Sequence, residues 1–382
     1  MQRTQALKGH ILTPQGFIAG VIAFADGHIT TLSGEPVATA RVRDAALPII
    51  LPGFIDLHVH GGGGHDIMEG GDAAAHIARL HAQHGTTALL ATTMTAPASD
   101  LEIAFAGLTA LCAKERAVRA NGARILGVHL EGPYINAGKL GAQPDYARPL
   151  QMDELQHLHA LAPIRLITLA PEVEGNMAAI ASLCAAGFRV QLGHSLATYE
   201  QGVEAMTRGA AGFTHLFNAM TGMHHRQPGL VGAALAHAEY AEIIPDMLHV
   251  HAGAMHVALR AIPRLFCVTD STAAAGMPDG EYRLGRHTVS KCMGGVRLAD
   301  GTLAGSTLTM DLALRNLVNQ LGLDLQAASK RVSTFAADYL GLPDRGRLAV
   351  GAFADMVVLD RELQLTDVYV EGVAMDRAGV ST

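Results

Sequence analysis

The sequence predicts an α/β fold class: a (β/α)8 TIM-like barrel with a small β-sandwich domain built from both chain ends. Two observations predict it. In the middle of the chain, short apolar runs alternate with helix-compatible stretches, a pattern typical of parallel βα units. Both chain ends instead contain short alternating strands separated by turns. We expect residues 1–52 and 346–382 to form the small domain and residues 53–345 to form the barrel.

The strand pattern can be followed along the chain. Residues 10–34 and 346–373 both have β-branched and aromatic residues broken by glycine-containing turns. The predicted barrel strands are residues 54–60, 87–93, 124–132, 165–172, 189–195, 212–218, 241–250 and 264–271. Eight strands joined by helices is the strand count of a barrel, whose active site lies at the C-terminal strand ends. Periodicity alone does not separate this barrel from an open doubly wound sheet.

Composition and charge exclude several classes of protein. The chain has 382 residues, of which 49% are hydrophobic and 16% charged, so it is not a disordered chain. We expect no transmembrane helix and no signal peptide, since the apolar runs are short and interrupted. A net charge of −7 without a Lys/Arg cluster argues against nucleic acid or a membrane as partner. The four cysteines form no CxxC pair, and we expect reduced thiols in a cytoplasmic protein.

Histidine is unusually frequent, with 20 residues in the chain, which raises the question of a bound metal. The first predicted barrel strand ends in His58-Val59-His60, followed by four glycines. Because residues two apart on a strand point to the same face, both imidazoles can reach one ion. Taken alone, such a pair is more often two histidines held by ordinary hydrogen bonds.

Four further candidates lie at the ends of other predicted strands: Glu131, His194, His215 and Asp270. Each alone is better explained as an ordinary loop or core residue. A barrel brings the C-terminal strand ends to one rim, and buried carboxylates without partners are costly, so together these residues favour a cation site. Nitrogen and oxygen ligands without cysteine suit Zn²⁺, Fe²⁺, Mn²⁺ or Co²⁺, and the sequence does not choose among them.

The chemistry of such a site is limited. A divalent ion lowers the pKa of bound water toward about 7 and polarises a carbonyl group. An adjacent aspartate can take the proton of the water and pass it to a leaving nitrogen. These residues therefore predict metal-assisted hydrolysis of an amide.

At this point the chain resembles a known family. The order of an N-terminal β segment, HxH-Gly, Glu, His, His, Asp and a closing β segment resembles the metal-dependent amidohydrolase superfamily. Within it, five motifs are similar to the family of N-acetylglucosamine-6-phosphate deacetylases. They are HLEGPY (129–134), LGHS (192–195), THLFNAM (214–220), VTDSTA (268–273) and GTLAGSTLTM (301–310). The resemblance covers nearly the whole chain and implies hydrolysis of the acetamide of N-acetyl-D-glucosamine 6-phosphate in amino-sugar metabolism.

The resemblance also implies metal ligands and a catalytic residue. The six positions are His58, His60, Glu131, His194, His215 and Asp270. The glutamate and the last two histidines match the ligands of a metal that is always present in the family. The HxH pair matches a second metal, which the glutamate bridges and the aspartate can contact, and the aspartate matches the general acid and base. The implied cofactor is therefore one or two divalent ions per subunit, Zn²⁺ or Fe²⁺ first and Mn²⁺ or Co²⁺ as alternatives.

The substrate contacts implied by the family are Ala142, Asn218, Ala219, Arg226, His249, Leu303, Ala304 and Gly305. The asparagine and the backbone N–H that follows it match a phosphate-binding turn. The arginine matches a phosphate contact supplied by the neighbouring subunit, so the resemblance implies a homodimer that binds an amino-sugar phosphate. The histidine matches a group that recognises the sugar and polarises the acetamide carbonyl, and the last three residues match the acetyl pocket.

The chain departs from the family in two motifs. Gly141-Ala142-Gln143 stands where the family has Gly-Ala-His, so the role of Gln143 stays open. Phe335-Ala336-Ala337 replaces Asn-Pro-Ala in a region that we expect to be a structural helix, with little catalytic consequence. The roles of His224 and His225 also stay open, and a solvated loop is the expectation there. We expect three histidines on the helix after the first barrel strand to lie at the surface. They are His76, His81 and His84.

Three functional hypotheses follow. The first is the deacetylase reaction given above. The second keeps the superfamily but changes the substrate, to the galactosamine 6-phosphate epimer or to another N-acyl or cyclic amide; the phosphate-contact candidates argue against a cyclic amide. The third is a non-catalytic scaffold, which would be free to lose ligands that this chain retains.

Overall fold

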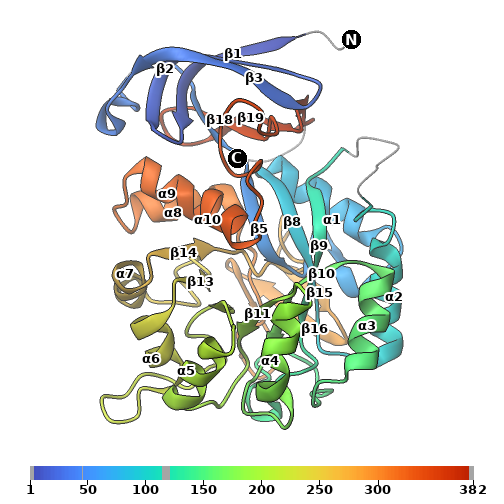
Figure 1. Cartoon of the computed structure of the whole chain (residues 1–382). Coiled ribbons are helices and arrows are strands. Elements are labelled where there is room, and N and C mark those ends of the chain that lie inside the picture. The colour runs from blue at the N-terminus through green and yellow to red at the C-terminus, as the bar shows by residue number, and fades with distance from the viewer. Residues whose placement is uncertain (1–3, 45, 114–120, 378–382) are drawn as a thin grey trace.

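The computed structural model describes residues 4–44, 46–113 and 121–377. These residues form a parallel βα barrel and, stacked on one end of it, a small sheet made from both ends of the chain (Figure 1). The predicted fold class is confirmed.

The small sheet has seven strands in the order β20-β19-β18-β4-β1-β2-β3. Their bounds are β1 Gln5–Thr13, β2 Gly16–Ala25, β3 His28–Pro36, β4 Ile49–Pro52, β18 Met356–Leu359, β19 Leu365–Val370 and β20 Val373–Ala374. The two chain ends meet where β4 lies between β1, its parallel neighbour, and β18, its antiparallel neighbour. Alternate side chains such as Ile11, Phe24 and Met356 form a separate apolar core. The expected sandwich is thus one continuous sheet that folds over, with β1–β3 above β18 and β19 (Figure 1).

Each of the eight predicted apolar runs overlaps one barrel strand. The strands are β5 Phe54–Val59, β8 Thr86–Thr93, β9 Arg124–Glu131, β10 Ile164–Leu169, β11 Arg189–Leu192, β12 Gly212–Phe213, β13 Tyr240–Ile243 and β14 Arg264–Cys267. The first six form one parallel sheet, and β13 and β14 form a parallel pair. Backbone hydrogen bonds join these two sheets, among them those from Leu216 N–H to Glu242 O and from Asp270 N–H to His58 O, both 2.9 Å. The strand ends therefore meet at one rim, as a barrel requires.

Helices cover the outside of the barrel and follow its strands. They are α1 Ala73–Gln83, α2 Ala98–Leu108, α3 Met152–Leu161, α4 Asn176–Ala185, α5 Tyr199–Thr207, α6 Gly229–His237, α7 Ala252–Ala261, α8 Met310–Asn319, α9 Leu325–Val332 and α10 Thr334–Tyr339. The last three helices lie between the barrel and the small sheet (Figure 1). Their buried residues, such as Leu314 and Tyr339, belong to the barrel core.

Several short elements lie in the loops beyond the strand ends. The strands β6 Gly61–Gly62 and β7 His65–Asp66 follow β5, and three-residue 3-10 helices span Thr39–Arg41, Ile67–Glu69 and Ala137–Lys139. After β14 the chain forms a three-stranded antiparallel sheet, β15 Gly280–Leu284, β16 His287–Cys292 and β17 Gly295–Arg297. This sheet has its own apolar cluster, with Leu284, Val289 and Val296 buried against Met94. It lies beside the strand ends that carry the candidate site.

One expectation about the helix after the first barrel strand is wrong. His81 is fully buried, whereas we expected it at the surface. Its Nε2 lies 3.0 Å from the carbonyl oxygen of Gly61 and 3.1 Å from Ser271 Oγ, so it ties α1 to the loops at the rim. Burial lowers the pKa of His81 to about 4, and this histidine is therefore a neutral structural group.

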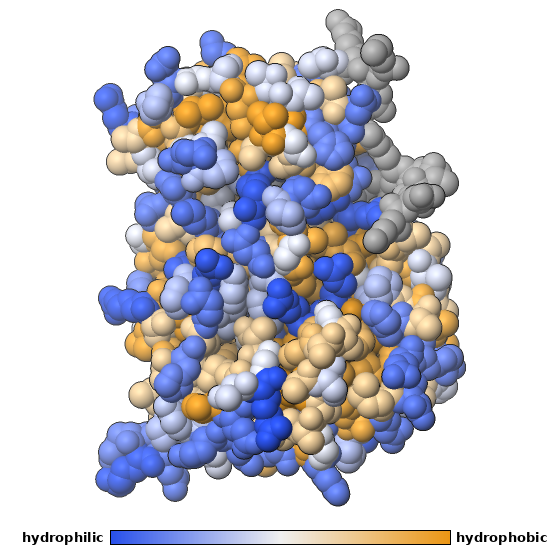
Figure 2. All heavy atoms as spheres, viewed as in Figure 1, coloured by the Kyte–Doolittle hydropathy of each residue, from blue (hydrophilic) through white to orange (hydrophobic). Residues whose placement is uncertain are grey.

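The surface is mixed in character. On the face shown in Figure 2, apolar residues are interspersed with polar ones and do not gather into a continuous belt. None of the helices in the described part of the chain has the length and apolarity that crossing a bilayer requires.

Candidate active site

A cavity of about 380 Å³ opens at the C-terminal ends of the barrel strands. Eleven of the predicted site residues line it: His60, Glu131, Ala142, His194, His215, Asn218, Ala219, His249, Asp270, Leu303 and Gly305. The structure thus brings together residues that are far apart in sequence, as the barrel rim predicts.

The remaining three predicted residues lie elsewhere. His58 is fully buried behind His60, with the two Nε2 atoms 3.1 Å apart. Ala304 is buried in the apolar cluster beneath the three-stranded sheet. Arg226 is exposed and lines a separate cavity of about 470 Å³ with its neighbours His224 and Gln227. Within one subunit, Arg226 therefore does not reach the cavity at the rim.

Unusual backbone conformations aim several of these side chains. His194, His215, Ala219 and Asp270 have φ of 49°, 29°, 51° and 50°, the left-handed region that non-glycine residues seldom occupy. Each lies just beyond a barrel strand, where the chain leaves the strand direction. Backbone strain of this kind persists where the surrounding structure enforces it and clusters at functional sites. The sequence motifs around these residues therefore specify a rim geometry.

The first candidate metal cluster is formed by three side chains from three different strand ends. Glu131 Oε1 lies 3.1 Å from His194 Nε2 and 3.0 Å from His215 Nε2, and the two Nε2 atoms are 3.1 Å apart. His194 Nδ1 lies 2.8 Å from the carbonyl oxygen of Lys139, which can only accept, so Nδ1 carries the proton. In the neutral ring, Nε2 then presents a lone pair to the cluster. All three side chains are buried.

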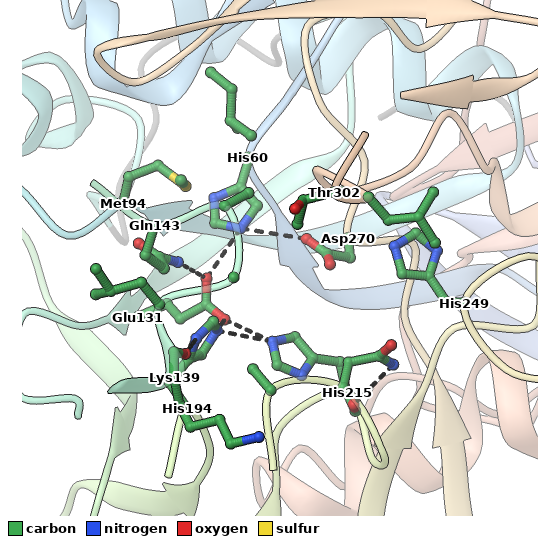
Figure 3. A pocket seen from close by; sticks show the side chains of 18 of the residues that line it. His60, Met94, Glu131, Lys139, Gln143, His194, His215, His249, Asp270 and Thr302 are labelled. Atoms are coloured by element: carbon green, nitrogen blue, oxygen red, sulfur yellow. Dashed lines mark hydrogen bonds and ion pairs between the residues drawn. The ribbon is translucent and has the colours of Figure 1, made fainter. Parts of the chain in front are cut away.

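The second cluster uses the other oxygen of the same carboxylate. Glu131 Oε2 lies 3.4 Å from His58 Nε2 and 3.1 Å from His60 Nε2, and Asp270 Oδ1 lies 3.5 Å and 3.3 Å from these atoms. Figure 3 shows His60 in contact with both Glu131 and Asp270. His60 Nδ1 is 3.2 Å from the carbonyl oxygen of Thr92, which fixes its proton on Nδ1. Nε2 of this ring is therefore also free to bind a cation.

These donor sets fit divalent cations. Both groups, Glu131 with His194 and His215 and Glu131 with His58 and His60, have ligand atoms within 4.8 Å of one another. A tetrahedral zinc ion with bonds of 2.0–2.1 Å spaces its ligands about 3.3 Å apart, close to the 3.0–3.4 Å observed. Imidazole nitrogens that face each other at 3.1 Å without an intervening proton repel, and a shared cation removes that repulsion. Each oxygen of Glu131 therefore belongs to a different donor set, and each set fits a divalent cation.

The electrostatics of the protein alone point the same way. Burial raises the pKa of Asp270, but the imidazoles of His58 and His60 outweigh it and lower that pKa to about 2. Burial lowers the pKa of His60, but Asp270 and Glu131 outweigh it and raise that pKa to about 9. The carboxylates thus draw positive charge into the cluster, which protons or cations can supply.

Other residues of the cavity wall are suited to binding a polar ligand. His249 lies on the same side of the cavity as Asp270 (Figure 3), and its Nδ1 lies 2.6 Å from Asp246 Oδ2. Burial lowers the pKa of His249, but the bond to Asp246 outweighs it and raises the pKa. Asn218 is held by a hydrogen bond from its side-chain amide to the carbonyl oxygen of His215, 3.1 Å. Lys139 also lines the cavity and brings a positive charge to it.

Two buried polar residues were not assigned from the sequence. Gln143 donates from Nε2 to Glu131 Oε2, 2.6 Å, and accepts at Oε1 from the backbone N–H of Thr95, 2.6 Å. Because a backbone N–H can only donate, the orientation of this amide is fixed. Glu242 is fully buried, and its Oε2 lies 3.1 Å from His58 Nδ1. The sequence signal for Glu242 was its position inside the apolar run of residues 241–250, because an acid buried in a strand needs a polar partner.

Comparison of the sequence with known proteins matches the chain to a family. The amidohydrolase family matches residues 49–378. An N-acetylgalactosamine-6-phosphate deacetylase of Escherichia coli O157:H7 is 39% identical over 370 residues, 95% of this chain and 96% of the relative. An N-acetylglucosamine-6-phosphate deacetylase of Lysinibacillus sphaericus is 41% identical over 323 residues, 83% of this chain and 82% of the relative.

Solved structures agree over the full length. The chain superimposes on N-acetylglucosamine-6-phosphate deacetylase from Thermotoga maritima with a TM-score of 0.89 and 30% identity, covering 98% of this chain and 100% of the other. It matches an aspartate-to-alanine mutant of the Mycobacterium smegmatis deacetylase, in complex with N-acetyl-D-glucosamine-6-phosphate, with a TM-score of 0.88 and 34% identity, again covering 98% and 100%.

Proposed function

Because the chain belongs to the amidohydrolase family, we propose that it hydrolyses the acetamide of N-acetyl-D-glucosamine 6-phosphate to D-glucosamine 6-phosphate and acetate. The observation that carries the proposal is the pair of histidine clusters sharing Glu131, with Asp270 beside them in an open cavity. Relatives and solved structures named as deacetylases of this substrate, one of them with the substrate bound, support the choice of reaction.

Two sets of residues hold the cofactor in this proposal. Glu131, His194 and His215 bind one divalent ion, and His58 and His60 bind a second with the other oxygen of the glutamate. The nitrogen and oxygen donors suit Zn²⁺ or Fe²⁺, with Mn²⁺ or Co²⁺ as alternatives. A bound divalent ion supplies two kinds of chemistry: it lowers the pKa of bound water toward about 7 and polarises a carbonyl oxygen.

Asp270 moves the proton in the proposed reaction. Its carboxylate lines the cavity, is held ionised by the adjacent imidazoles, and has one oxygen within 3.3 Å of His60 Nε2. It accepts the proton of the attacking water and then delivers it to the amine nitrogen as the C–N bond breaks. Nitrogen leaves poorly as an anion, so this second transfer is as necessary as the first.

His249 orients the acetamide. Its Nδ1–H donates to Asp246, which fixes the ring and favours the protonated form, so that Nε2–H is available as a donor. A donor on this side of the cavity stabilises the negative charge that develops on the carbonyl oxygen in the transition state. Ala142, Leu303 and Gly305 line the same cavity, and we assign them to the wall around the acetyl group. Ala304, which is buried, supports this wall.

In this proposal the phosphate binds at the part of the cavity wall formed by Asn218 and Ala219. Asn218 and the backbone N–H of Ala219 offer uncharged donors there. Arg226 lies outside the cavity of its own subunit, which supports its supply by a neighbouring subunit in a homodimer. A guanidinium fork from that subunit would complete a site for a phosphate dianion. The local positive field then outweighs the net charge of −7.

Cytoplasmic location is part of the proposal. A phosphorylated sugar carries charge and does not cross a bilayer unaided, so an enzyme that acts on it meets it where it is made. The four cysteines are far apart in the sequence and form no CxxC pair, a pattern typical of proteins that work in a reducing compartment.

The test is release of acetate and free amine from four substrates: the N-acetylglucosamine and N-acetylgalactosamine 6-phosphates and the two unphosphorylated sugars. We expect N-acetylglucosamine 6-phosphate to have the highest kcat/KM. The two unphosphorylated sugars should have a kcat/KM at least 100-fold lower, since they lack the charge-assisted contacts of the phosphate. A higher kcat/KM on N-acetylgalactosamine 6-phosphate would make that compound the primary substrate instead. N-acetylgalactosamine 6-phosphate is included as the second candidate substrate because the E. coli relative named as a deacetylase of this compound is 39% identical over 95% of this chain. Absence of hydrolysis of all four would overturn the proposal.

A further inference from the structure

A fully buried carboxylate lies behind the second metal cluster. Glu242 is on β13, and its Oε2 lies 3.1 Å from His58 Nδ1 and 3.2 Å from the backbone nitrogen of His215. Its other oxygen, Oε1, has no hydrogen-bond partner among the described residues. Within that same set of residues it pairs with no lysine or arginine, and His58 is its only ion-pair partner. A buried acid placed this way needs an explanation.

The contact to His58 decides which nitrogen of that ring can bind a cation. A carboxylate oxygen accepts, so His58 Nδ1 donates its proton to Glu242. The lone pair of the neutral ring is then on Nε2, which faces His60 Nε2 at 3.1 Å and Glu131 Oε2 at 3.4 Å. With the proton on the other nitrogen, His58 would turn an N–H toward the cluster and could not act as a ligand.

His129, which lies beside His58, does not replace Glu242 as the partner of His58 Nδ1. The ring of His129 packs edge-on against that of His58, with centroids 4.6 Å apart, but both of its nitrogens are engaged. Its Nδ1 donates to the carbonyl oxygen of Leu57 at 3.0 Å, and its Nε2 lies 2.7 Å from Thr168 Oγ1. The group of His58, His129 and Glu242 therefore lacks a free imidazole nitrogen and is not a third cation site, although its atoms lie within 4.8 Å of one another.

We propose that Glu242 is a positioning residue that makes the His58–His60 pair competent to hold the second divalent cation. Its second contact, to the backbone N–H of His215, connects the same carboxylate to the first cluster, so that one side chain braces a ligand of each. This inference rests on the proposed function only in taking the two clusters as cation sites. It does not depend on which amide is hydrolysed.

The size of the effect follows from the role. A carboxylate that receives the N–H of a metal-binding histidine fixes the ring and raises its basicity, and its loss costs 10–100-fold in metal affinity. The first cluster loses less, because His194 is oriented by a different acceptor, the carbonyl oxygen of Lys139. The expected signature is therefore selective weakening of one of the two ions.

The experiment measures Zn²⁺ binding by equilibrium dialysis of the metal-stripped full-length protein, with metal counted by mass spectrometry. In Glu242→Gln we expect the tighter ion to be kept and the weaker ion to bind 10–100-fold less tightly, with unchanged circular dichroism. Glu242→Asp keeps the charge but withdraws it by one methylene and should also weaken only that ion. Asp311→Asn is the matched control: it removes another buried carboxylate, which pairs with His84 and Arg315, and should leave both affinities unchanged.

A double-mutant cycle tests the route of the effect. If Glu242 acts through His58, then Glu242→Gln added to His58→Gln should weaken the second ion no further than His58→Gln alone. The inference is overturned if Glu242→Gln binds both ions with wild-type affinity, if a folded variant loses both ions equally, or if the wild-type protein binds a single ion. Failure of the proposed function is a separate result: a wild-type protein that binds two ions but releases no acetate leaves this inference intact.

Discussion

Replacing Asp270 by asparagine tests the proposed chemistry most directly. The substitution keeps the size of the side chain and an oxygen near the His58 and His60 Nε2 atoms, which lie 3.5 Å and 3.3 Å from Asp270 Oδ1. It removes the charge and the ability to accept a proton. General acid–base catalysis contributes about 10²–10⁴-fold, so we expect kcat to fall by that factor, equivalent to about 3–5.5 kcal/mol of transition-state free energy.

Metal content should change little in Asp270→Asn. In the proposed site Glu131, His194 and His215 would hold the first ion without it, and the HxH pair would still offer two nitrogens to the second. The measurements are kcat and KM on the best phosphorylated substrate, together with metal per subunit. Asp100→Asn is the control, because that aspartate pairs with Arg286 outside the cavity and should retain near-wild-type kcat. Activity of Asp270→Asn within tenfold of wild type would refute the proton-transfer role, and loss of metal would make Asp270 chiefly a ligand.

Three further predictions concern the supporting structure. Gln143→Leu removes the amide that donates to Glu131 Oε2 and should lower stability by about 1–3 kcal/mol in urea unfolding while also reducing kcat; an unchanged kcat would contradict its orienting role. Arg345→Met leaves the buried Asp355 unpaired and should cost about 3–5 kcal/mol, most of which a second change, Asp355→Leu, should restore; a loss below 1 kcal/mol would refute this. Burial raises the pKa of Asp311, but a facing imidazole and guanidinium outweigh it and hold that pKa well below its usual value. Its stabilisation is therefore fully present above about pH 4 and lost only as the pH falls through the lowered pKa of the folded state, so the stability gap between wild type and Asp311→Asn should be widest at pH 7 and shrink steadily as the pH is lowered below 4; a gap that widens on acidification would contradict the assignment.

Much of the rim could be predicted from the sequence because its residues follow strands that are themselves easy to recognise. Glu131, for example, ends a run of eight residues that is buried along most of its length, and parallel strands in a barrel bring such ends together. The HxH spacing adds the periodicity of a strand. Where both signals coincide, a pattern that is local in sequence specifies a geometry that is local in space.

Contacts across the barrel interior could not be predicted in this way. Glu242 and His58 are 184 residues apart and come from β13 and β5, which are not neighbours in the barrel. Their pairing depends on barrel closure and on which way each strand faces, and one sequence contains neither. His81 shows the same limit on a helix: a polar side chain that looks exposed by composition is buried because backbone and hydroxyl groups at the rim need a partner.

The charge balance of the buried site connects these findings. Glu131, Asp270 and Glu242 place three carboxylates within one cluster of imidazoles, and among the described residues no lysine or arginine forms an ion pair with these carboxylates. One divalent ion leaves a net negative charge in this interior that only a proton on the His58–His60 pair can offset, and it faces a substrate that is itself an anion. Two divalent ions reverse the sign, which favours both the developing oxyanion and the approach of a phosphorylated sugar. On this reasoning the third carboxylate, Glu242, is tolerated in the barrel interior because the site is built for two cations, and a protein that holds only one should be less stable with Glu242 than with glutamine in its place.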